Sequence, residues 1–339
     1  MHQSILFTPS EDKTVQCQIC QRECKIPPGK TGFCRTRKNV DGQLHSIIYG
    51  KVSSVRVSPV EIKPLFHFFP GSKWLSLGSL GCNFRCPGCQ NWEISHADVA
   101  KQIPFTEYIP PEKVVQLAIE ENCKGISWTY NEPTLWLEYT LDTAKIAKEQ
   151  GLLINYVTNG YITTEAMNLL GPYLDAYRVD LKGFSAHTYK RIANVPDFKG
   201  ILHNIRTAKY QSSIHVEIIT NLTPGYNDDE DELNDMAHWI VNQLGPDTPW
   251  HITRFVPHYK LSHLDYTPVS QLEQARHIGI AQGLRYVYLG NVPGHAAENT
   301  YCPQCGNLII KRRNYQILQY NLQGNKCTFC NQTIAGCFE

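Results

Sequence analysis

Clustered cysteines are the sequence feature that most limits what this chain can fold into. Of its thirteen cysteines, only Cys123 and Cys337 stand outside three groups that have the spacing of metal ligands. The groups are Cys17, Cys20, Cys24 and Cys34; Cys82, Cys86 and Cys89; and Cys302, Cys305, Cys327 and Cys330. The first residues, MHQSILFTPS, lack the basic and apolar regions of a secretory signal. Because the cytosol keeps thiols reduced, the groups predict metal binding in a cytoplasmic protein rather than a disulfide framework.

The charge balance limits the choice of partners. The chain has 32 Lys and Arg residues against 31 Asp and Glu residues, which gives a net charge of +1. This balance offers no electrostatic argument for a nucleic-acid or membrane partner. No apolar run approaches the roughly 18 residues that a membrane-spanning helix needs. We therefore expect neither nucleic acid nor membrane as a partner.

The middle of the chain alternates between strand-like and helix-like segments. The candidate strands are Trp74–Gly78, Gly125–Tyr130, Leu153–Thr158, Ala176–Asp180, His215–Thr220, Trp250–Phe255 and Tyr286–Leu289. The candidate helices are Pro111–Asn122, Thr134–Gln150, Thr163–Leu170, Asp229–Asn242 and Val269–Gln282. Repeated strand–helix units predict an α/β fold with a parallel sheet, which is either open or bent into a full or partial barrel.

The positions of unusual polar residues favour the barrel. Nearly every such group follows the end of a candidate strand: the three central cysteines, Asn131-Glu132-Pro133, Thr158-Asn159-Gly160, Asp180 with Lys182, Pro224–Asp228, and Arg254 with His258. Barrel enzymes build their sites from loops at the carboxyl ends of successive strands. A doubly wound sheet would gather ligands at one switch point, which two or three loops reach. Six groups therefore indicate a barrel.

The central cysteines have the pattern C-x3-C-x2-C, within Gly81–Trp92. Three cysteines on one short loop can bind three irons of a [4Fe–4S] cluster and leave the fourth iron without a protein ligand. An open metal position suits a reactive centre, whereas structural sites close their coordination shell. The alternative is an electron-transfer cluster or a zinc site whose fourth ligand lies elsewhere in the chain.

This cysteine pattern resembles the signature of the radical S-adenosylmethionine (SAM) superfamily. The resemblance implies a partial (β/α)6 TIM-like barrel over residues 72–290, with a [4Fe–4S] cluster that cleaves SAM to a 5′-deoxyadenosyl radical. It also implies that Asn131 and Glu132 meet the methionine amine, and that Asn159, Asp180 and Lys182 contact the ribose and carboxylate. Taken singly, each of these residues also has an ordinary structural interpretation. Asn159 fits a turn, Asp180 and Lys182 fit a solvated charge pair, and Glu132 fits an acid at a helix N-terminus. Tyr130-Asn131 stands where the family has Gly-Gly.

Several short sequence segments, from Gly81–Trp92 to Pro224–Asp228, resemble segments of pyruvate formate-lyase activating enzymes. The whole chain resembles most the AmmeMemoRadiSam-system radical SAM proteins, which implies a Memo-like or AmmeCR-like partner and a flavodoxin or ferredoxin as electron donor. Three functions follow: radical modification of an unidentified metabolite or protein, activation of a glycyl-radical enzyme, or non-enzymatic electron transfer. No ferredoxin-like cysteines lie between Cys89 and Cys123, where activases usually have them.

The outer cysteine groups predict two further metal sites. Two C-x2-C pairs, with a β-rich stretch between them, have the spacing of a zinc ribbon, and they place such a domain at residues 291–339. The N-terminal group, in a turn-rich region of residues 1–71, fits zinc and a second iron–sulfur cluster equally well. His251, His258, His263 and Arg254 are candidates for a substrate pocket, although such residues are more often satisfied core or rim groups.

Overall fold

The computed structural model describes all residues, 1–339, in two compact units. The first unit consists of Met1–Ser58, Lys73–Tyr177 and Phe198–Ile214. The second unit consists of Pro59–Ser72, Arg178–Asp197 and His215–Glu339. Strand β13 (Ala176–Asp180) runs from the first unit into the second. Boundaries at residues 71 and 290 stay a prediction.

Parallel strands form the centre of the first unit. Strands β9 (Lys73–Gly78), β11 (Gly125–Trp128) and β12 (Leu153–Thr158) pair in parallel, with β11 in the middle. Their side chains are almost all buried on both faces, as expected of strands that are covered on either side. All three strands were predicted. The additional strand β8 (Ser54–Pro59), which lies next to β9, was not.

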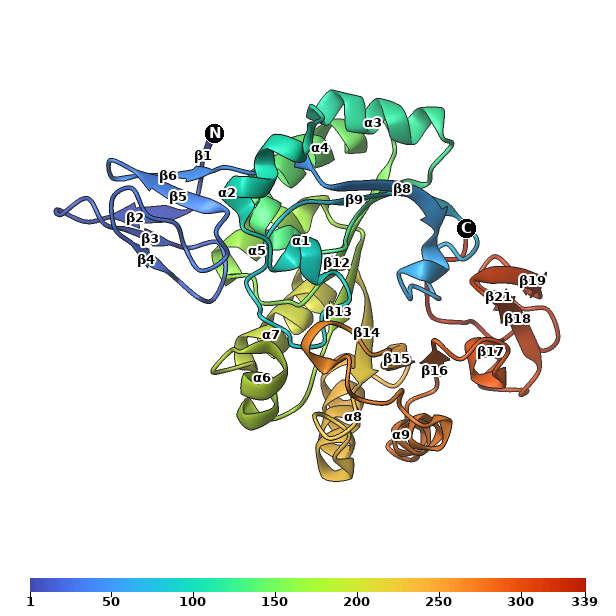
Figure 1. Ribbon diagram of the computed structural model, residues 1–339. Coiled ribbons are helices and arrows are strands. Elements are labelled where there is room, and N and C mark those ends of the chain that lie inside the picture. The colour runs from blue at the N-terminus through green and yellow to red at the C-terminus, as the bar shows by residue number, and fades with distance from the viewer. The chain divides into compact units, whose positions relative to one another are not determined.

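The strands of the second unit are also parallel. Strand β15 (Trp250–Arg254) lies between β14 (His215–Leu222) and β16 (Val287–Gly290). Helix α9 (Val269–Ala281) packs against β15 and β16, and α8 (Glu230–Leu244) packs beside α9 (Figure 1). The parallel pairing in both units confirms the α/β class.

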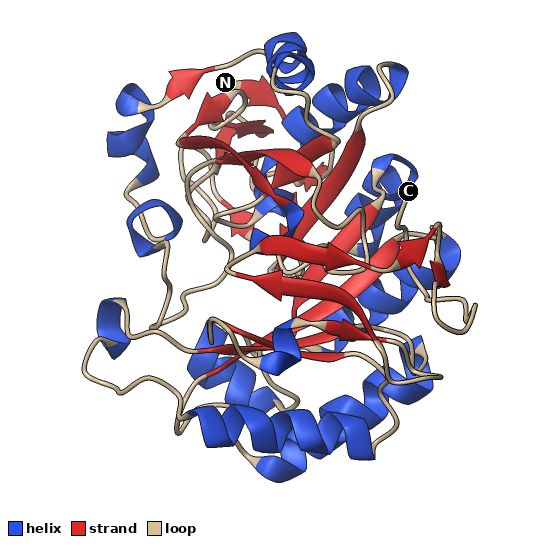
Figure 2. Ribbon diagram, turned by 90° about the vertical axis from the view of Figure 1, so that its right-hand side faces the viewer, coloured by secondary structure: helices blue, strands red, loops and turns tan.

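The helices mostly begin and end where the sequence predicts. Helices α3 (Pro111–Glu120), α4 (Leu137–Glu149) and α5 (Thr164–Leu170) lie within two to three residues of their expected bounds, and a short 3-10 helix, η3 (Pro133–Trp136), precedes α4. Pro111 occupies the first turn of α3, where its missing N–H costs nothing. The helices that were not predicted are all short: α1 (Trp92–Ser95), α2 (Val99–Gln102), α6 (Ala186–Ala193) and α7 (Lys199–Arg206). Figure 2 shows the helices in blue beside the red strands.

The N-terminal cysteine region consists of short antiparallel strands. Two three-stranded sheets have the orders β1-β6-β5 and β2-β3-β4. Their strands are β1 (His2–Gln3), β2 (Phe7–Pro9), β3 (Val15–Cys17), β4 (Lys25–Ile26), β5 (Arg37–Val40) and β6 (Gln43–Ser46). A separate pair joins β7 (Lys51–Val52) to β10 (Glu107–Tyr108).

The C-terminal cysteine region also consists of short antiparallel strands. One sheet contains β17 (Thr300–Tyr301), β18 (Leu308–Arg313) and β19 (Gln316–Tyr320), and a hairpin pairs β20 (Leu322–Gln323) with β21 (Lys326–Cys327). Cys302, Cys327 and Ile309 share one hydrophobic core with Phe66 and Tyr288. The end of the chain is therefore packed onto the rest of the second unit.

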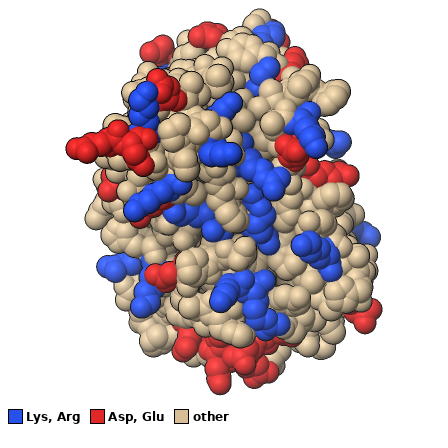
Figure 3. Space-filling model, turned by 60° about the vertical axis from the view of Figure 1, so that its left-hand side comes forward, with Lys and Arg blue, Asp and Glu red and all other residues tan.

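The surface carries both signs of charge. Figure 3 shows Lys and Arg side chains spread over the displayed face, with Asp and Glu side chains among them. None of the helices is both long enough and apolar enough to cross a membrane. All thirteen cysteines are free thiols, as metal ligands must be.

Candidate metal and cofactor sites

The loop that follows β9 carries the three central cysteines. We call residues 81–89 the radical loop, after the chemistry that its sequence predicts. The backbone N–H of Phe84 donates to the Cys82 sulfur at 3.3 Å. The pKa of Cys82 is raised well above its usual value, first by burial and then by the nearby Glu132, Cys86 and Cys89. The structure therefore brings the three central thiols together with one acidic residue.

Asn131 holds the start of this loop. Its Oδ1 accepts the backbone N–H of Ser79 at 3.0 Å, and its Nδ2 donates to the carbonyl of Gly81 at 2.8 Å. Each of its two polar atoms keeps the capacity for one more hydrogen bond. Asn131 therefore fixes the backbone just before Cys82 and can still bind a ligand.

Glu132 lies in a cradle of hydrogen-bond donors. Its carboxylate accepts the backbone N–H of Thr134 at 3.0 Å, the hydroxyl of Thr158 at 2.7 Å and the backbone N–H of Asn159 at 2.8 Å. Burial raises the pKa of Glu132, and these hydrogen bonds offset only part of the rise. A carboxylate offers about four acceptor positions, so one remains for a further donor.

Asn159 connects this cradle to the radical loop. Its Nδ2 donates to Oδ1 of Asn83 at 2.8 Å and lies 4.0 Å from the sulfur of Cys82, while its Oδ1 accepts the backbone N–H of Tyr161. Asn131, Glu132 and Asn159 therefore all lie around the cysteine loop. Asn83, to which the sequence assigns no role, has a buried Nδ2 without a hydrogen-bond partner.

Tyr130 adopts a backbone conformation that glycine favours. Its φ of +73° lies in the left-handed region, where a side chain costs roughly 1–2 kcal/mol. Beside it, a Cβ on Gly78 would lie only 2.9 Å from the Tyr130 ring. Tyr130, at the first of the two positions where the family has glycine, therefore adopts a conformation that glycine reaches without this cost.

Asp180 and Lys182 belong to the second unit. Asp180 forms ion pairs with Arg178 at 2.7 Å and with Lys182 at 3.0 Å. Burial alone would raise the pKa of Asp180, but these two cations hold it below its usual value. Asp180 is therefore ionised at neutral pH. The sequence suggested Lys182 as its partner but did not suggest Arg178.

The C-terminal cysteines close around one point. Cys302 Sγ and Cys330 Sγ are 3.5 Å apart, and Cys305 Sγ and Cys327 Sγ are 3.8 Å apart. In the whole chain, only these four form a group of three or more potential ligands whose binding atoms all lie within 4.8 Å of one another. The backbone N–H of Asn307 lowers the pKa of Cys305 to about 6.

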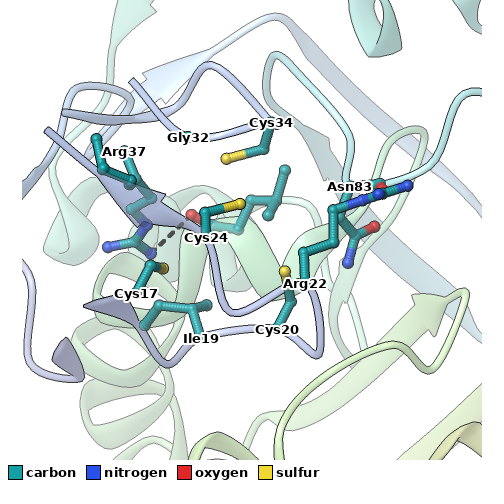
Figure 4. Close-up of a pocket in the computed structure, with 11 residues that line it drawn as sticks. Cys17, Ile19, Cys20, Arg22, Cys24, Gly32, Cys34, Arg37 and Asn83 are labelled. Atoms are coloured by element: carbon teal, nitrogen blue, oxygen red, sulfur yellow. Dashed lines mark hydrogen bonds between the residues drawn. The ribbon is translucent and has the colours of Figure 1, made fainter. Parts of the chain in front are cut away.

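The N-terminal cysteines surround an open space instead. Cys17, Cys20, Cys24 and Cys34 line one cavity of about 10 Å³, with Arg22, Arg37 and Asn83 on its wall (Figure 4). We call this space the N-terminal cavity. Burial raises the pKa of Cys17 to about 12 and raises that of Cys20 as well. The nearby Arg37 offsets only part of the rise in the pKa of Cys17.

Two of the candidate pocket residues have hydrogen-bond partners within the protein. His251 is buried, and its Nε2 lies 2.6 Å from a carboxylate oxygen of Glu217. Arg254 donates to the carbonyl of Thr267 at 2.8 Å. His258 is half-buried and His263 is exposed. His251 is thus a satisfied core residue, the more common of the two expectations.

Comparisons with known proteins agree with the cysteine pattern. Residues 77–240 match the family model described as the Radical SAM superfamily. An uncharacterized protein of Methanocaldococcus jannaschii is 43% identical over 98% of this chain and 99% of its own length. A pyruvate formate-lyase-activating enzyme of Clostridium pasteurianum is 24% identical, covering 55% of this chain and 78% of its own.

A solved structure supports the fold. A radical SAM methyltransferase from Sphaerobacter thermophilus superimposes with a TM-score of 0.50 at 14% identity, over 71% of each chain. At this identity the likeness concerns the fold alone.

Proposed function

This chain belongs to the radical SAM superfamily, and from that premise we propose that it cleaves SAM reductively to modify an unidentified metabolite or protein. We assign the [4Fe–4S] cluster to Cys82, Cys86 and Cys89. When bound, the cluster and SAM supply a 5′-deoxyadenosyl radical that abstracts a hydrogen atom from the substrate.

The observation that carries this proposal is the radical loop with its single acidic neighbour. The chain offers three thiols there, and Glu132 is the further charged group beside Cys82. Three cysteines leave one iron of a [4Fe–4S] cluster free for another ligand. The residues present therefore fit a cluster that binds a small molecule.

We assign the methionine amine of SAM to Glu132 and Asn131. An ammonium group needs acceptors, and Glu132 has one unused acceptor position in a buried setting where a charge-assisted hydrogen bond is strong. Asn131 supplies the second acceptor with its amide oxygen. The role of Thr134, Thr158 and the Asn159 backbone is to keep the Glu132 carboxylate in place.

We assign the ribose and carboxylate of SAM to Asn159, Asp180 and Lys182. A carboxylate needs a cation, and Lys182 already faces Asp180 in a charged pair. A ribose needs hydroxyl partners, and the Asn159 amide and the Asp180 carboxylate can supply them. We further propose the partial (β/α)6 barrel as the scaffold of these loops, since barrel enzymes carry their sites on loops of this kind.

We propose zinc as the metal of the C-terminal cysteines. A tetrahedral zinc about 2.3 Å from each sulfur places the sulfurs roughly 3.8 Å apart. The separations of 3.5 Å and 3.8 Å match that value. Four thiolates complete the zinc shell, so the site stabilises the structure and takes no part in catalysis.

An electron donor is required by this class of enzyme, and we propose flavodoxin or ferredoxin. We propose a Memo-like or AmmeCR-like protein as a further partner and the cytoplasm as the location, which the thirteen free thiols favour. Activation of a glycyl-radical enzyme is the second candidate function, favoured by the 24% identity to a pyruvate formate-lyase-activating enzyme.

An anaerobic assay tests the main proposal. Reconstituted protein receives dithionite and SAM, and 5′-deoxyadenosine is measured by liquid chromatography and mass spectrometry. We expect product from the natural chain, none from Cys86→Ala, and at least roughly 10-fold weaker SAM binding in Glu132→Gln, which loses a charge-assisted hydrogen bond. Cys123→Ala, outside the three groups, is the matched control.

The opposite outcome would favour an electron carrier. Protein that carries its full iron, becomes reduced and still leaves SAM intact would contradict the enzyme proposal. A glycyl radical on a candidate lyase, seen by electron paramagnetic resonance (EPR), would select the second candidate.

A further inference from the structure

The N-terminal cavity is too open for a zinc site. Four thiolates that close on one zinc at about 2.3 Å leave no water-sized space between them. Here all four thiols line a cavity of about 10 Å³, together with Ile19 and Ile26. The four sulfurs also lie outside the 4.8 Å limit that the C-terminal set satisfies. Because this spread is wider than the shell of one zinc, a cluster of several metal ions suits these four thiols better than a single ion.

Two buried N–H donors on the cavity wall have no acceptor. Nδ2 of Asn83 and Nε of Arg37 are buried without a hydrogen-bond partner, and both residues line the cavity. An unpaired buried donor costs about 1–3 kcal/mol, so such groups are rare in folded proteins. Their presence on two sides of the cysteines favours an occupant that accepts hydrogen bonds. The sulfur atoms of an iron–sulfur cluster do so.

A hydroxyl group already lies beside one of the thiols. The hydroxyl of Thr36 lies 3.1 Å from the sulfur of Cys34. Hydrogen bonds to the sulfurs are one of the means by which proteins set the potential of a cluster. The cavity is therefore built around sulfur ligands.

We propose that Cys17, Cys20, Cys24 and Cys34 bind a second iron–sulfur cluster and that this cluster passes electrons to the radical loop. Four cysteines complete the shell of the second cluster, which leaves no open iron for a substrate. Electron transfer is then its chemistry. The relay role, but not the cluster itself, rests on the function proposed above.

The two cysteine loops are in direct contact. Nε of Arg22, two residues after Cys20, donates to the carbonyl of Asn83, next to Cys82. A Cβ on Gly81 would lie only 2.7 Å from the carbonyl oxygen of Cys34, so the two backbones touch. The backbone at Cys34 therefore lies directly against the loop that carries Cys82.

Two arginines reinforce this contact through Phe33. Arg22 lies 3.5 Å from the centre of the Phe33 ring and Arg85 lies 4.4 Å from it. Arg85 also donates to the carbonyls of Phe33 and Cys82, both at 2.7 Å. The ring and the two guanidinium groups hold the N-terminal segment against the radical loop.

The relay transfers one electron at a time. A reduced one-electron carrier protein is oxidised by one electron and reduces the N-terminal cluster, which then reduces the cluster of the radical loop and returns to its oxidised state. No bond forms or breaks, and no proton is transferred in these steps.

Metal analysis of the full chain tests the cluster without reference to SAM. The variant Cys82→Ala/Cys86→Ala/Cys89→Ala is reconstituted anaerobically, and its iron, sulfide and zinc are measured. We expect two to four irons per chain, matching sulfide, and an EPR signal after reduction. When Cys17→Ala and Cys24→Ala are added to this variant, iron binding should be abolished and one zinc per chain should remain. Loss of all iron in the first variant, with two zincs bound, would overturn the proposal.

A rate comparison tests the relay. For the natural chain and for Cys24→Ala, SAM cleavage is measured once with dithionite and once with a reduced flavodoxin. In Cys24→Ala we expect the flavodoxin-supported rate to fall toward the rate measured without any carrier protein. The ratio of the flavodoxin-supported rate to the dithionite-supported rate should therefore be lower than in the natural chain. An unchanged ratio in protein that has lost the N-terminal iron would overturn the relay and leave the cluster assignment to the metal analysis.

Discussion

The two outer sets each consist of four cysteines, but the geometry of the two sets is very different. The C-terminal thiols lie as close together as the ligands of one zinc, and two of them are part of a hydrophobic core. The N-terminal thiols line a cavity whose wall carries arginine and unpaired N–H groups. A closed shell inside a core stabilises a fold, whereas an open, polar cavity receives a larger group. Cysteine count alone does not distinguish the two.

The largest difference should appear when a ligand is removed from each set. Cys327→Ala opens the zinc shell inside the core that Ile309 and Phe66 share, and we expect loss of one zinc and a destabilisation of several kcal/mol. Structural zinc contributes up to about 10–16 kcal/mol in small zinc-finger peptides. Calorimetry of the full chain, with zinc analysis, measures the effect.

Cys17→Ala is the matched change in the other set. It should remove N-terminal iron and leave the zinc content at one per chain. Equal zinc loss from both variants would show that the two sets hold the same metal, and the comparison would fail.

A glycine on the wall of the N-terminal cavity gives a second test that leaves every cysteine in place. A Cβ on Gly32 would lie 3.1 Å from Ile26 and 3.7 Å from the sulfur of Cys24. The methyl groups of Gly32→Val therefore enter the cavity, and we expect the iron of that site to be lost while zinc binding persists. Iron and zinc analysis reads both sites in one sample.

Gly306, beside the C-terminal cysteines, supplies the control. Its φ is +70° and nothing lies within 4 Å of its added Cβ, so Gly306→Asn has open space and a side chain that tolerates this conformation. It should keep both metals. Retention of iron by Gly32→Val would mean that the cavity is not the binding site.

The strands could be predicted because their signal is local. Buried runs such as Leu153–Thr158 and Ala176–Asp180 appear at the predicted bounds. Helices α6 and α7 were missed because both have only eight residues and present a short apolar face. The metal ligands were visible as motifs, whereas two of the three donors to Glu132, Thr158 and Asn159, come from a separate segment that no sequence spacing links to it.

The geometry of the cysteine sets could not be read from the sequence. Spacing predicted zinc at the C-terminus and left two metals open at the N-terminus. The separation of the sulfurs depends on how β3, β4 and the turn at Gly32 pack, and on Asn83 and Leu135 from distant segments. Such contacts are set by tertiary packing.

Acid should weaken the surroundings of the two sets at different pH values. Burial lowers the pKa of His67, which contacts Tyr288 next to the zinc region, to about 4. The unfolded chain takes up that proton near pH 6.5, so stability is lost as the pH falls from 6.5 to 4, by about 3 kcal/mol in all.

The ion pair of Arg37 and Glu138, beside the N-terminal cavity, loses its stabilising effect at a lower pH than His67 does. Glu138 is buried, but Arg37, at 2.7 Å, holds its pKa below 4.5, so its stabilisation is lost only below that pH. Between pH 6.5 and 4.5 only the second unit should lose stability through these groups. Calorimetry at several pH values, with His67→Gln as the comparison, measures this. Equal slopes for both proteins would contradict the prediction.

The smallest expected effect concerns the surface around the N-terminal cysteines. Between Cys17 and Lys38 the chain has six basic residues and one acidic residue, and Lys25, Lys30 and Arg35 are exposed. If an acidic carrier delivers electrons here, reversal of these three charges to Glu should slow flavodoxin-supported SAM cleavage, because electrostatic attraction raises association rates. The same reversal at Lys311, Arg313 and Lys326, which are exposed near the zinc region, is the control. We expect a several-fold decrease for the first variant at low salt, which shrinks toward 1 M salt as charges are screened. A salt-independent decrease, or an equal one in the control, would mean that the carrier does not dock at the N-terminal set.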